Sequence, residues 1–375
     1  MANTRGALAR LAPYVLGALG VTMLLLVARS FIGSSGFAYD FEAYDSAARR
    51  IAAGLPLYPP GTAEAYNSGS YAGLYLYPPP PAVALLPLTL LDAGTAALAW
   101  LWIRMALLVG GMLILPASAL TRGALLAVAA LSFPVWYDLN LGNMSIVLFA
   151  LSAAIWRFCT GPIGAVALAA AGVLRYPFGI VLLGWAARRA SRPAATTVVA
   201  GLVIGAVTLP LVGVSGWLDY AQIVTTLGDV STGVHNLNLA NTAAAVGIGG
   251  PNALWVAVGM GIALGATGYA ALRRDSETAV VVSLAATILF FPFFHPHYLV
   301  QLLIPAAYLA GRGQWWGLVL PLLGWLPGEW LPLVAVAGTL LPLLPARVGA
   351  LRLGAGRLDA GAGFGTGPRQ PATPG

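Results

Sequence analysis

Apolar runs recur along the chain from Leu11 to Leu344, and they limit its fold more than any other feature. A helix that crosses a bilayer needs about 20 apolar residues. Only 8% of the 375 residues are charged, whereas a soluble domain has about 25%. Because no separate soluble domain fits between the runs, the sequence predicts an all-α membrane protein that crosses the bilayer many times.

The arginines predict how the chain crosses the bilayer, because arginines near the ends of spans favour the cytoplasmic side. On that rule we expect a transmembrane helical bundle with about twelve spans, both chain ends inside, and a site formed by the outer loops. The expected spans are 11–33, 95–118, 123–138, 144–158, 162–174, 177–187, 194–214, 252–271, 278–294, 298–311, 314–327 and 329–346. We expect residues 1–353 to form one integral-membrane domain and the Gly- and Pro-rich residues 354–375 a disordered cytoplasmic tail.

Two longer segments, 34–94 and 215–250, are expected to be outer loops. The first contains PPPPAVALLPLTLL (78–91), which is short for a span and begins with four prolines. We expect it to form a helix at the membrane interface. The many tyrosines of this loop are expected at the interface by default, although aromatic rings and hydroxyls also bind sugars.

The charge distribution and the cysteine count argue against a nucleic-acid partner and against cysteine-based cross-links or metal sites. The chain has a formal charge of +7 and no lysine, but its arginines are scattered singly or in pairs, so we expect no nucleic-acid partner. The single cysteine, Cys159, excludes an internal disulfide and a Cys-based metal site.

Polar residues from distant parts of the sequence fall on the predicted outer side, whereas the arginine clusters fall inside. The outer set is Asp40, Glu42, Asp45, Asp138, Asn143, Asp219, His235, Asn236, Asn241, His295 and His297. Their shared face predicts a common site.

The segment FAYDFEAYDSAARRIAAGLPLY (37–58) concentrates charge in a chain with little of it. Asp40 and Tyr44 are spaced i, i+4 and share one helix face. Asp40 could be the N-cap of a solvated helix, or it could be a general base at the membrane surface. Asp45 and Glu42 lie on other faces and are expected to pair with Arg49 or Arg50.

Several short motifs, taken in order, resemble one known family. They are YDFEAY (39–44), AARRIAAGLPLY (47–58), YLYPPPPA (75–82), LGNMS (141–145), LRYP (174–177), NLANT (238–242) and FFHPH (293–297). This set resembles glycosyltransferase family 87, a family of integral-membrane enzymes of the GT-C class. Asn143 stands where that family usually has Gln, Arg175 replaces a Lys, and Pro296 splits a pair of histidines.

The resemblance implies a hexosyltransferase of the cell membrane with its active site on the extracytoplasmic face. The donor would be a polyprenyl-phosphate sugar, most often mannose, and the acceptor a cell-envelope glycolipid, glycan or glycoprotein. Asp40 would be the catalytic base of an inverting displacement. No cofactor and no metal are implied. The substrate-binding residues would be Tyr44, Tyr77, Asn143, Arg175, Asn241, His295 and His297.

The residues themselves leave alternatives open. Arg175 falls between two apolar spans on the outer side, where it could bind a lipid phosphate or only snorkel to the membrane surface. His295 and His297 could serve a substrate site, pack structurally or, with less support, bind a metal. Asp138 and Asn143 could cap helix ends. A secondary transporter or lipid flippase is the alternative function, although the polar groups gather at one end of the predicted bundle and no internal repeat is visible.

Overall fold

The computed structural model describes residues 2–67, 73–159, 161–227, 237–290 and 294–345, and every regular element in these ranges is helical. The α-helices are α1 (Ala2–Phe31), α2 (Tyr39–Ala52), α3 (Thr62–Asn67), α4 (Pro79–Ala84), α5 (Ala93–Ile114), α6 (Ala119–Leu131), α7 (Phe133–Leu141), α8 (Ser145–Arg157), α9 (Pro162–Leu174), α10 (Gly179–Ala187), α11 (Ser191–Leu227), α12 (Leu239–Ala245), α13 (Asn252–Arg273), α14 (Ser276–Ala286), α15 (Leu303–Gly311) and α16 (Leu331–Leu340). The 3₁₀ helices are η1 (Leu86–Leu90), η2 (Tyr176–Phe178), η4 (Pro296–Leu302), η5 (Trp315–Trp325), η6 (Gly328–Trp330) and η7 (Leu341–Leu343). The all-α prediction is confirmed, while the predicted tail, His235 and Asn236 lie outside the described residues.

The number of spans differs from the expectation. Within the described residues, four helices are long and apolar enough to cross a membrane: α1, α5, α11 and α13. A fifth span results if α6 and α7, which meet at an angle of 65°, are taken together. The other apolar helices have only 10–17 residues, so the count of about twelve spans is not confirmed. The chain is nonetheless a multi-pass membrane protein.

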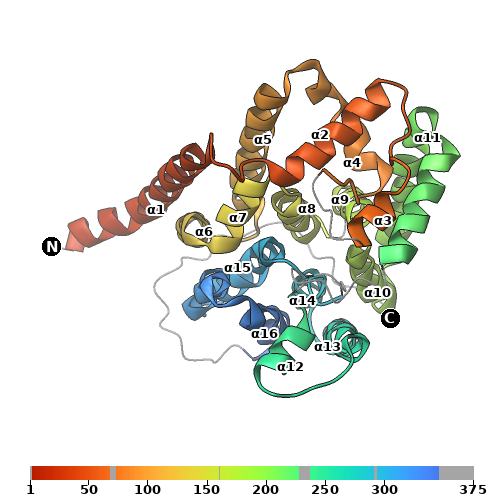
Figure 1. Cartoon of the computed structure of the whole chain (residues 1–375). Helices are drawn as coiled ribbons and strands as arrows, with labels where there is room; N and C mark the ends of the chain where they lie inside the picture. Colours follow the sequence, from red (N-terminus) through yellow and green to blue (C-terminus); the bar gives the residue numbers. More distant parts are fainter. Residues whose placement is uncertain (1, 68–72, 160, 228–236, 291–293, 346–375) are drawn as a thin grey trace, which may run out of the picture.

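The helices pack into a bundle (Figure 1). Helix α1 packs along α6 and otherwise extends away from the bundle. The series α5, α8, α9 and α11 packs pairwise in that order, and α10, α13 and α14 form a neighbouring group. A large apolar core of Leu, Ala, Val and Ile runs through α5, α8, α9, α14 and α15.

A second, smaller core fixes α2 to the bundle. Helix α2 is amphipathic, and it buries Phe41, Tyr44, Ala47 and Ala48 against α4 and α5. The stretch 78–91 forms α4 and η1, and α4 packs on α2 and α11. Proline is tolerated at the start of α4 because the N–H groups of a helix's first turn have no acceptor within the helix, so the N–H that proline lacks costs no helix hydrogen bond. The described parts of the segment 34–94, which the sequence predicts as an outer loop, therefore form a packed layer of helices.

The corner between α7 and α8 receives the start of α2 at very short range. Gly142 ends α7 with a φ of 84°, a conformation that glycine adopts without strain. A Cβ at this position would lie 2.7 Å from the Cβ of Phe41. Trp100 Nε1 donates to the carbonyl of Gly142 at 2.8 Å. Only glycine lets the corner and α2 approach this closely.

Candidate functional site

Asp40 lies in the first turn of α2 and faces the corner between α7 and α8. Its Oδ2 accepts a hydrogen bond from Nδ2 of Asn143 at 2.8 Å. Burial raises the pKa of Asp40, while the Asn143 hydrogen bond and the positive charge of Arg104 act in the opposite direction. Once ionised, such a carboxylate is a better proton acceptor than an ordinary surface aspartate.

The N-cap interpretation of Asp40 is wrong. The N-cap of α2 is Ala38, in the left-handed conformation with a φ of 62° and no side-chain cap. The start of the helix is held instead by the Ala38 N–H, which donates to the carbonyl of Asn140 at 2.7 Å. The Asp40 carboxylate is therefore directed to Asn143 rather than to its own helix end.

The other charges of α2 fasten the helix to its neighbours. Arg49 Nε donates to Oδ2 of Asp45 at 2.7 Å, so the expected pairing of Asp45 is confirmed. The Arg49 guanidinium also donates to the carbonyls of Thr89 and Leu91, at the end of η1. Glu42 is exposed. The charge cluster thus divides into one carboxylate that faces the α7–α8 corner and a group that holds α2 in place.

Tyr44 and Tyr77 line the same region as Asp40. Their rings meet edge to face with centroids 5.2 Å apart. The Tyr44 hydroxyl is buried and interacts with the Tyr77 hydroxyl. Tyr58 and Tyr75 are also buried in this layer, so their rings pack against protein.

Asn143 has a fixed amide orientation. Its Oδ1 accepts hydrogen bonds from the Met144 N–H at 2.7 Å and the Ser145 hydroxyl at 3.2 Å. The Nδ2 group therefore faces Asp40. Asn143 is a connecting residue between α7 and α8, and its side chain links the start of α8 to the candidate base.

A buried ion pair stabilises the corner on which Asn143 stands. Arg104 of α5 and Asp138 of α7 are fully buried, with NH1 and Oδ1 3.3 Å apart. Arg104 also donates to the carbonyls of Asp138 and Leu139, at 2.6 and 3.0 Å. Oδ2 of Asp138 accepts the Ser145 N–H at 3.0 Å. The pair thereby joins α5, the end of α7 and the start of α8, and the expectation that Asp138 caps a helix end is supported.

Arg175 ends α9 and lies against Tyr298. Its guanidinium carbon is 3.3 Å from the centre of the Tyr298 ring, a close cation–π contact. Its charge also acts on the Tyr77 hydroxyl, whose pKa burial raises and Arg175 lowers. Asp40 acts electrostatically on Tyr77 and Tyr298 as well. The structure therefore brings the candidate base and the candidate phosphate ligand to the same two tyrosines.

A small hollow adjoins Arg175. It measures about 10 Å³ and is lined by Arg175, Tyr298, Ser145 and Gln301, among others. The amide nitrogen of Gln301 is buried without a partner among the described residues. A hollow of this size holds about one water molecule, so a phosphate bound at this point would require these side chains to move.

The two histidines stack on each other beside this region. The rings of His295 and His297 are 5.4 Å apart and nearly parallel, and His297 meets Tyr298 edge to face at 4.5 Å. Burial, His295 and Arg175 together lower the pKa of His297 well below its usual range. His297 is therefore neutral at pH 7, so one ring nitrogen can donate a hydrogen bond and the other can accept one.

Among the contacts of the described residues, none joins Asn241 to the other predicted site residues. Its side-chain oxygen accepts the N–H of Asn238 at 3.1 Å, as half of a capping box at the start of α12. Helix α12 lies at the opposite side of the bundle from α2 (Figure 1). The structure thus gives Asn241 a local role in helix capping.

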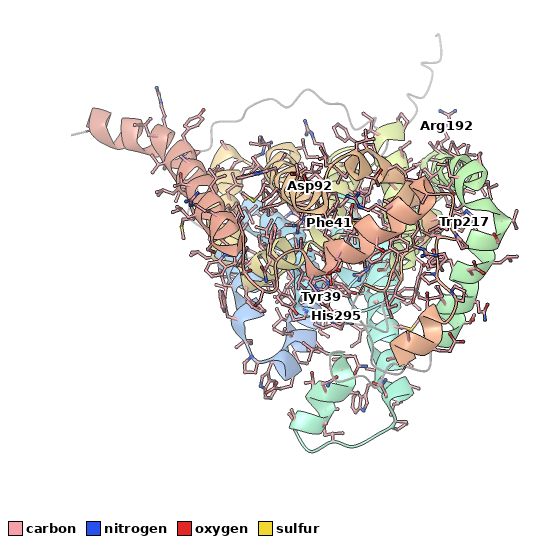
Figure 2. The ribbon with its side chains drawn as sticks, turned by 45° about the horizontal axis from the view of Figure 1, so that its top comes forward. Tyr39, Phe41, Asp92, Arg192, Trp217 and His295 are labelled. Carbon is pink, nitrogen blue, oxygen red and sulfur yellow. The ribbon has the colours of Figure 1, made fainter. Side chains whose placement is uncertain are left out.

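Arg104 and Tyr298 were missed by the sequence argument. Arg104 carried a usable signal, because a charge inside a predicted span is costly and normally has a buried partner. Tyr298 carried none, since tyrosine is common near span ends. Figure 2 shows Arg192 at the edge of the molecule. Among the described residues, no three His, Cys, Asp or Glu side chains are placed to hold a metal ion together.

Replacing Asn143 by Ala should shift the acid limb of the pH–rate profile to higher pH by about 1–2 units. The Asn143 amide favours the ionised form of Asp40, and a hydrogen bond to a charged group contributes about 1.5–3 kcal/mol. Without it the pKa of Asp40 rises further, and the protonated fraction, which cannot act as a base, grows at any given pH. The control is Asn140→Ala, on the same corner, which should leave the limb in place. If the acid limb of the pH–rate profile is unchanged in Asn143→Ala, the protonation of Asp40 does not control the rate.

Comparison with protein-family models matches residues 75–296 to glycosyltransferase family 87. No curated protein and no solved structure matches the chain. The matched range contains Tyr77, Asn143, Arg175, Asn241 and His295, whereas Asp40, Tyr44 and His297 lie outside it. The role of Asp40 therefore rests on its geometry. Since the match covers more than half of the chain, the protein belongs to glycosyltransferase family 87 and is a membrane glycosyltransferase.

Proposed function

We propose that the protein transfers a hexose, with mannose preferred, from a polyprenyl-phosphate sugar to a glycolipid, glycan or glycoprotein of the cell envelope. The observation that carries this proposal is the arrangement of Asp40 and Arg175. A half-buried carboxylate held by Asn143 and a guanidinium held on Tyr298 act on the same tyrosine, Tyr77. A proton acceptor and a phosphate ligand in such proximity suit a displacement at an anomeric carbon.

The proposed reaction is a single inverting step. Asp40 takes the proton of the acceptor hydroxyl as its oxygen attacks the anomeric carbon. The new carbon–oxygen bond forms while the bond from that carbon to the phosphate oxygen breaks. Polyprenyl phosphate leaves with the bonding electron pair, and Arg175 stabilises the charge that develops on it. The neutral His297 and the Tyr44 hydroxyl supply hydrogen bonds for sugar hydroxyls.

The direct test is an activity assay on purified protein with a panel of synthetic polyprenyl-phosphate hexoses and, separately, nucleotide sugars. We expect transfer from a lipid-phosphate sugar, with mannose preferred. Turnover with a nucleotide sugar and none with any lipid-phosphate sugar would overturn the donor assignment. The protein would still be a glycosyltransferase.

Arg175→Ala should reduce donor use by roughly 30- to 160-fold. The loss of a charged, bidentate contact to phosphate corresponds to about 2–3 kcal/mol. Arg175→Lys should keep part of the activity, because an ammonium retains the charge but not the planar fork. The measurement is the dependence of rate on donor concentration. Arg192→Ala, an exposed arginine at the edge of the molecule, is the control. Unchanged donor kinetics in Arg175→Ala would exclude the phosphate role.

The proposed outer-face location can be tested with single cysteines in a Cys159→Ser background. Ser35 and Ser191 are both exposed, and they precede α2 and begin α11 respectively. We expect an impermeant thiol reagent to label Ser35→Cys on intact cells and Ser191→Cys only after lysis. The reverse pattern would place the site on the cytoplasmic face.

A further inference from the structure

A second cavity lies away from Asp40 and Arg175. It measures about 280 Å³ and is formed by α10, α14 and the segments beside α9 and α11. Most of its lining is apolar or small, including Val181, Gly184, Ala279 and Val280. Arg175 and the cavity residue Arg188 lie beyond opposite ends of α10, whose nine residues span about 14 Å. The cavity is therefore distinct from the candidate catalytic site.

Arg188 and Ser276 give this apolar cavity a polar rim. NH1 of Arg188 donates to the carbonyls of Ala271 and Arg274, at 3.0 and 2.8 Å, and NH2 donates to the Ser276 hydroxyl at 2.8 Å. A guanidinium has five N–H donors, so these bonds leave two of them uncommitted. Arg188 is fixed in position by α13 and α14 and still has donors for a ligand.

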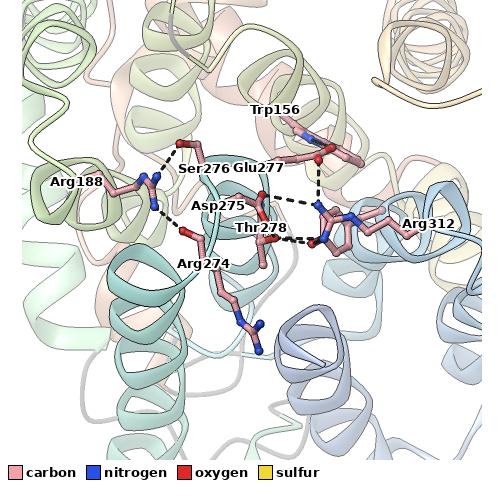
Figure 3. A network of polar contacts seen from close by, with 9 residues as sticks. Trp156, Arg188, Arg274, Asp275, Ser276, Glu277, Thr278 and Arg312 are labelled. Carbon is pink, nitrogen blue, oxygen red and sulfur yellow. Dashed lines mark hydrogen bonds and ion pairs between the residues drawn. The ribbon is translucent and has the colours of Figure 1, made fainter. Parts of the chain in front are cut away.

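The acids beside this rim are already neutralised by a different arginine. Arg312 lies 3.7 Å from a carboxylate oxygen of Asp275 and 3.2 Å from one of Glu277. Figure 3 shows Arg312 on one side of the start of α14 and Arg188 on the other. No acidic side chain among the described residues forms an ion pair with Arg188. The rim of the cavity therefore carries an uncompensated positive charge.

We propose that this cavity binds an anionic membrane phospholipid, with part of an acyl chain among the apolar residues and the phosphate on Arg188. An apolar chamber with one cationic end matches an amphiphile, and Arg binds phosphate through paired donors. Free phosphate would leave the apolar lining unused, and an uncharged lipid would leave Arg188 without a counter-ion. The volume is below that of a pocket for a drug-sized molecule, so only part of one chain is enclosed.

The test uses the full-length protein in a neutral detergent with phosphatidylglycerol as the probe. The single cysteine, Cys159, lines the cavity, so its alkylation by N-ethylmaleimide reports occupancy. We expect phosphatidylglycerol to slow alkylation several-fold and to remain bound in native mass spectra. Phosphatidylcholine should act more weakly, and inorganic phosphate should have no effect. Arg188→Gln should abolish the protection, whereas Arg10→Gln, an exposed arginine on α1, should retain it.

A cavity-filling variant keeps the test decisive if Arg188→Gln does not fold. Val280→Phe leaves the guanidinium in place but occupies the space of the chain, and phosphatidylglycerol should then give no additional protection of Cys159. The proposal is overturned if phosphatidylglycerol protects Val280→Phe as well as the parent protein. It is equally overturned if inorganic phosphate alone protects, or if no lipid slows alkylation of the parent.

Discussion

Asp40→Asn should reduce transfer by roughly 100-fold or more, the usual size of a general-base effect, while expression and thermal stability stay near those of the parent. The asparagine keeps the shape of the side chain, and its carbonyl oxygen can still accept the hydrogen bond that Asn143 donates to Asp40. It cannot take a proton from an acceptor hydroxyl. The N-cap of α2 is Ala38, so the substitution removes no helix cap. The rate of transfer and the thermal midpoint, measured on the same preparation, separate catalysis from folding.

The neighbouring acids are the matched controls. Glu42 is exposed, so Glu42→Gln should change the rate little. Asp45→Asn weakens the link to Arg49 and should lower stability more than it lowers the rate constant. If Asp40→Asn retains most of the activity while Glu42→Gln or Asp45→Asn abolishes it, the catalytic base is one of those neighbours and not Asp40. If all three variants stay active, the charge of α2 serves only to attach the helix.

Hydropathy predicted the helical class and the approximate positions of most elements, because burial in a bilayer demands apolar runs. Residues 162–174 were expected as a span, and α9 has those bounds. Hydropathy could not predict where a run breaks. The run predicted over 123–138 bends by 65° between α6 and α7, at Ser132, whose hydroxyl donates to the Pro321 carbonyl 189 residues further along the chain. Such a long-range contact leaves no periodic signal.

The site was predicted in part, and the reason differs from residue to residue. Asp40 and Asn143 could be named because both are polar in an apolar chain. That they bond to each other across 103 residues depends on the close approach of Phe41 to Gly142, which no local pattern encodes. Asn241 was grouped with them because it is polar and was expected on the same face. A capping box between Asn238 and Asn241 was also readable there, since asparagine is a favoured N-cap.

The family match and the geometry support different halves of the site. The match begins at Tyr75 and so includes the corner with Asn143 and the end of α9 with Arg175, but not α2. Three residues of the matched region contact α2. The Trp100 ring stacks on Phe41 with centroids 5.9 Å apart, Gly142 packs closely against Phe41, and Asn143 donates to Asp40. The candidate base thus lies on a helix outside the matched range, and this helix packs on the matched part of the chain. Any change that loosens this layer should reduce activity without touching a substrate.

Arg104→Met should be the most destabilising single substitution at the corner, with a loss of about 3–5 kcal/mol in the free energy of unfolding. The variant leaves Asp138 buried without its ion pair and removes the donors to the Asp138 and Leu139 carbonyls. The double variant Arg104→Met/Asp138→Leu removes both charges and should recover part of that loss, because an apolar pair avoids the cost of a lone buried charge. Thermal or denaturant unfolding in the same detergent measures each difference.

The control for this effect is Arg312→Met, which breaks ion pairs whose partners are about half exposed. Exposed pairs contribute about 0–1 kcal/mol, so this variant should unfold close to the parent. If Arg104→Met is no more destabilising than Arg312→Met, the buried pair does not hold the corner. If the double variant regains stability but not transfer, the pair also positions Asn143 for Asp40, since the Ser145 N–H loses its bond to Asp138 when leucine replaces it.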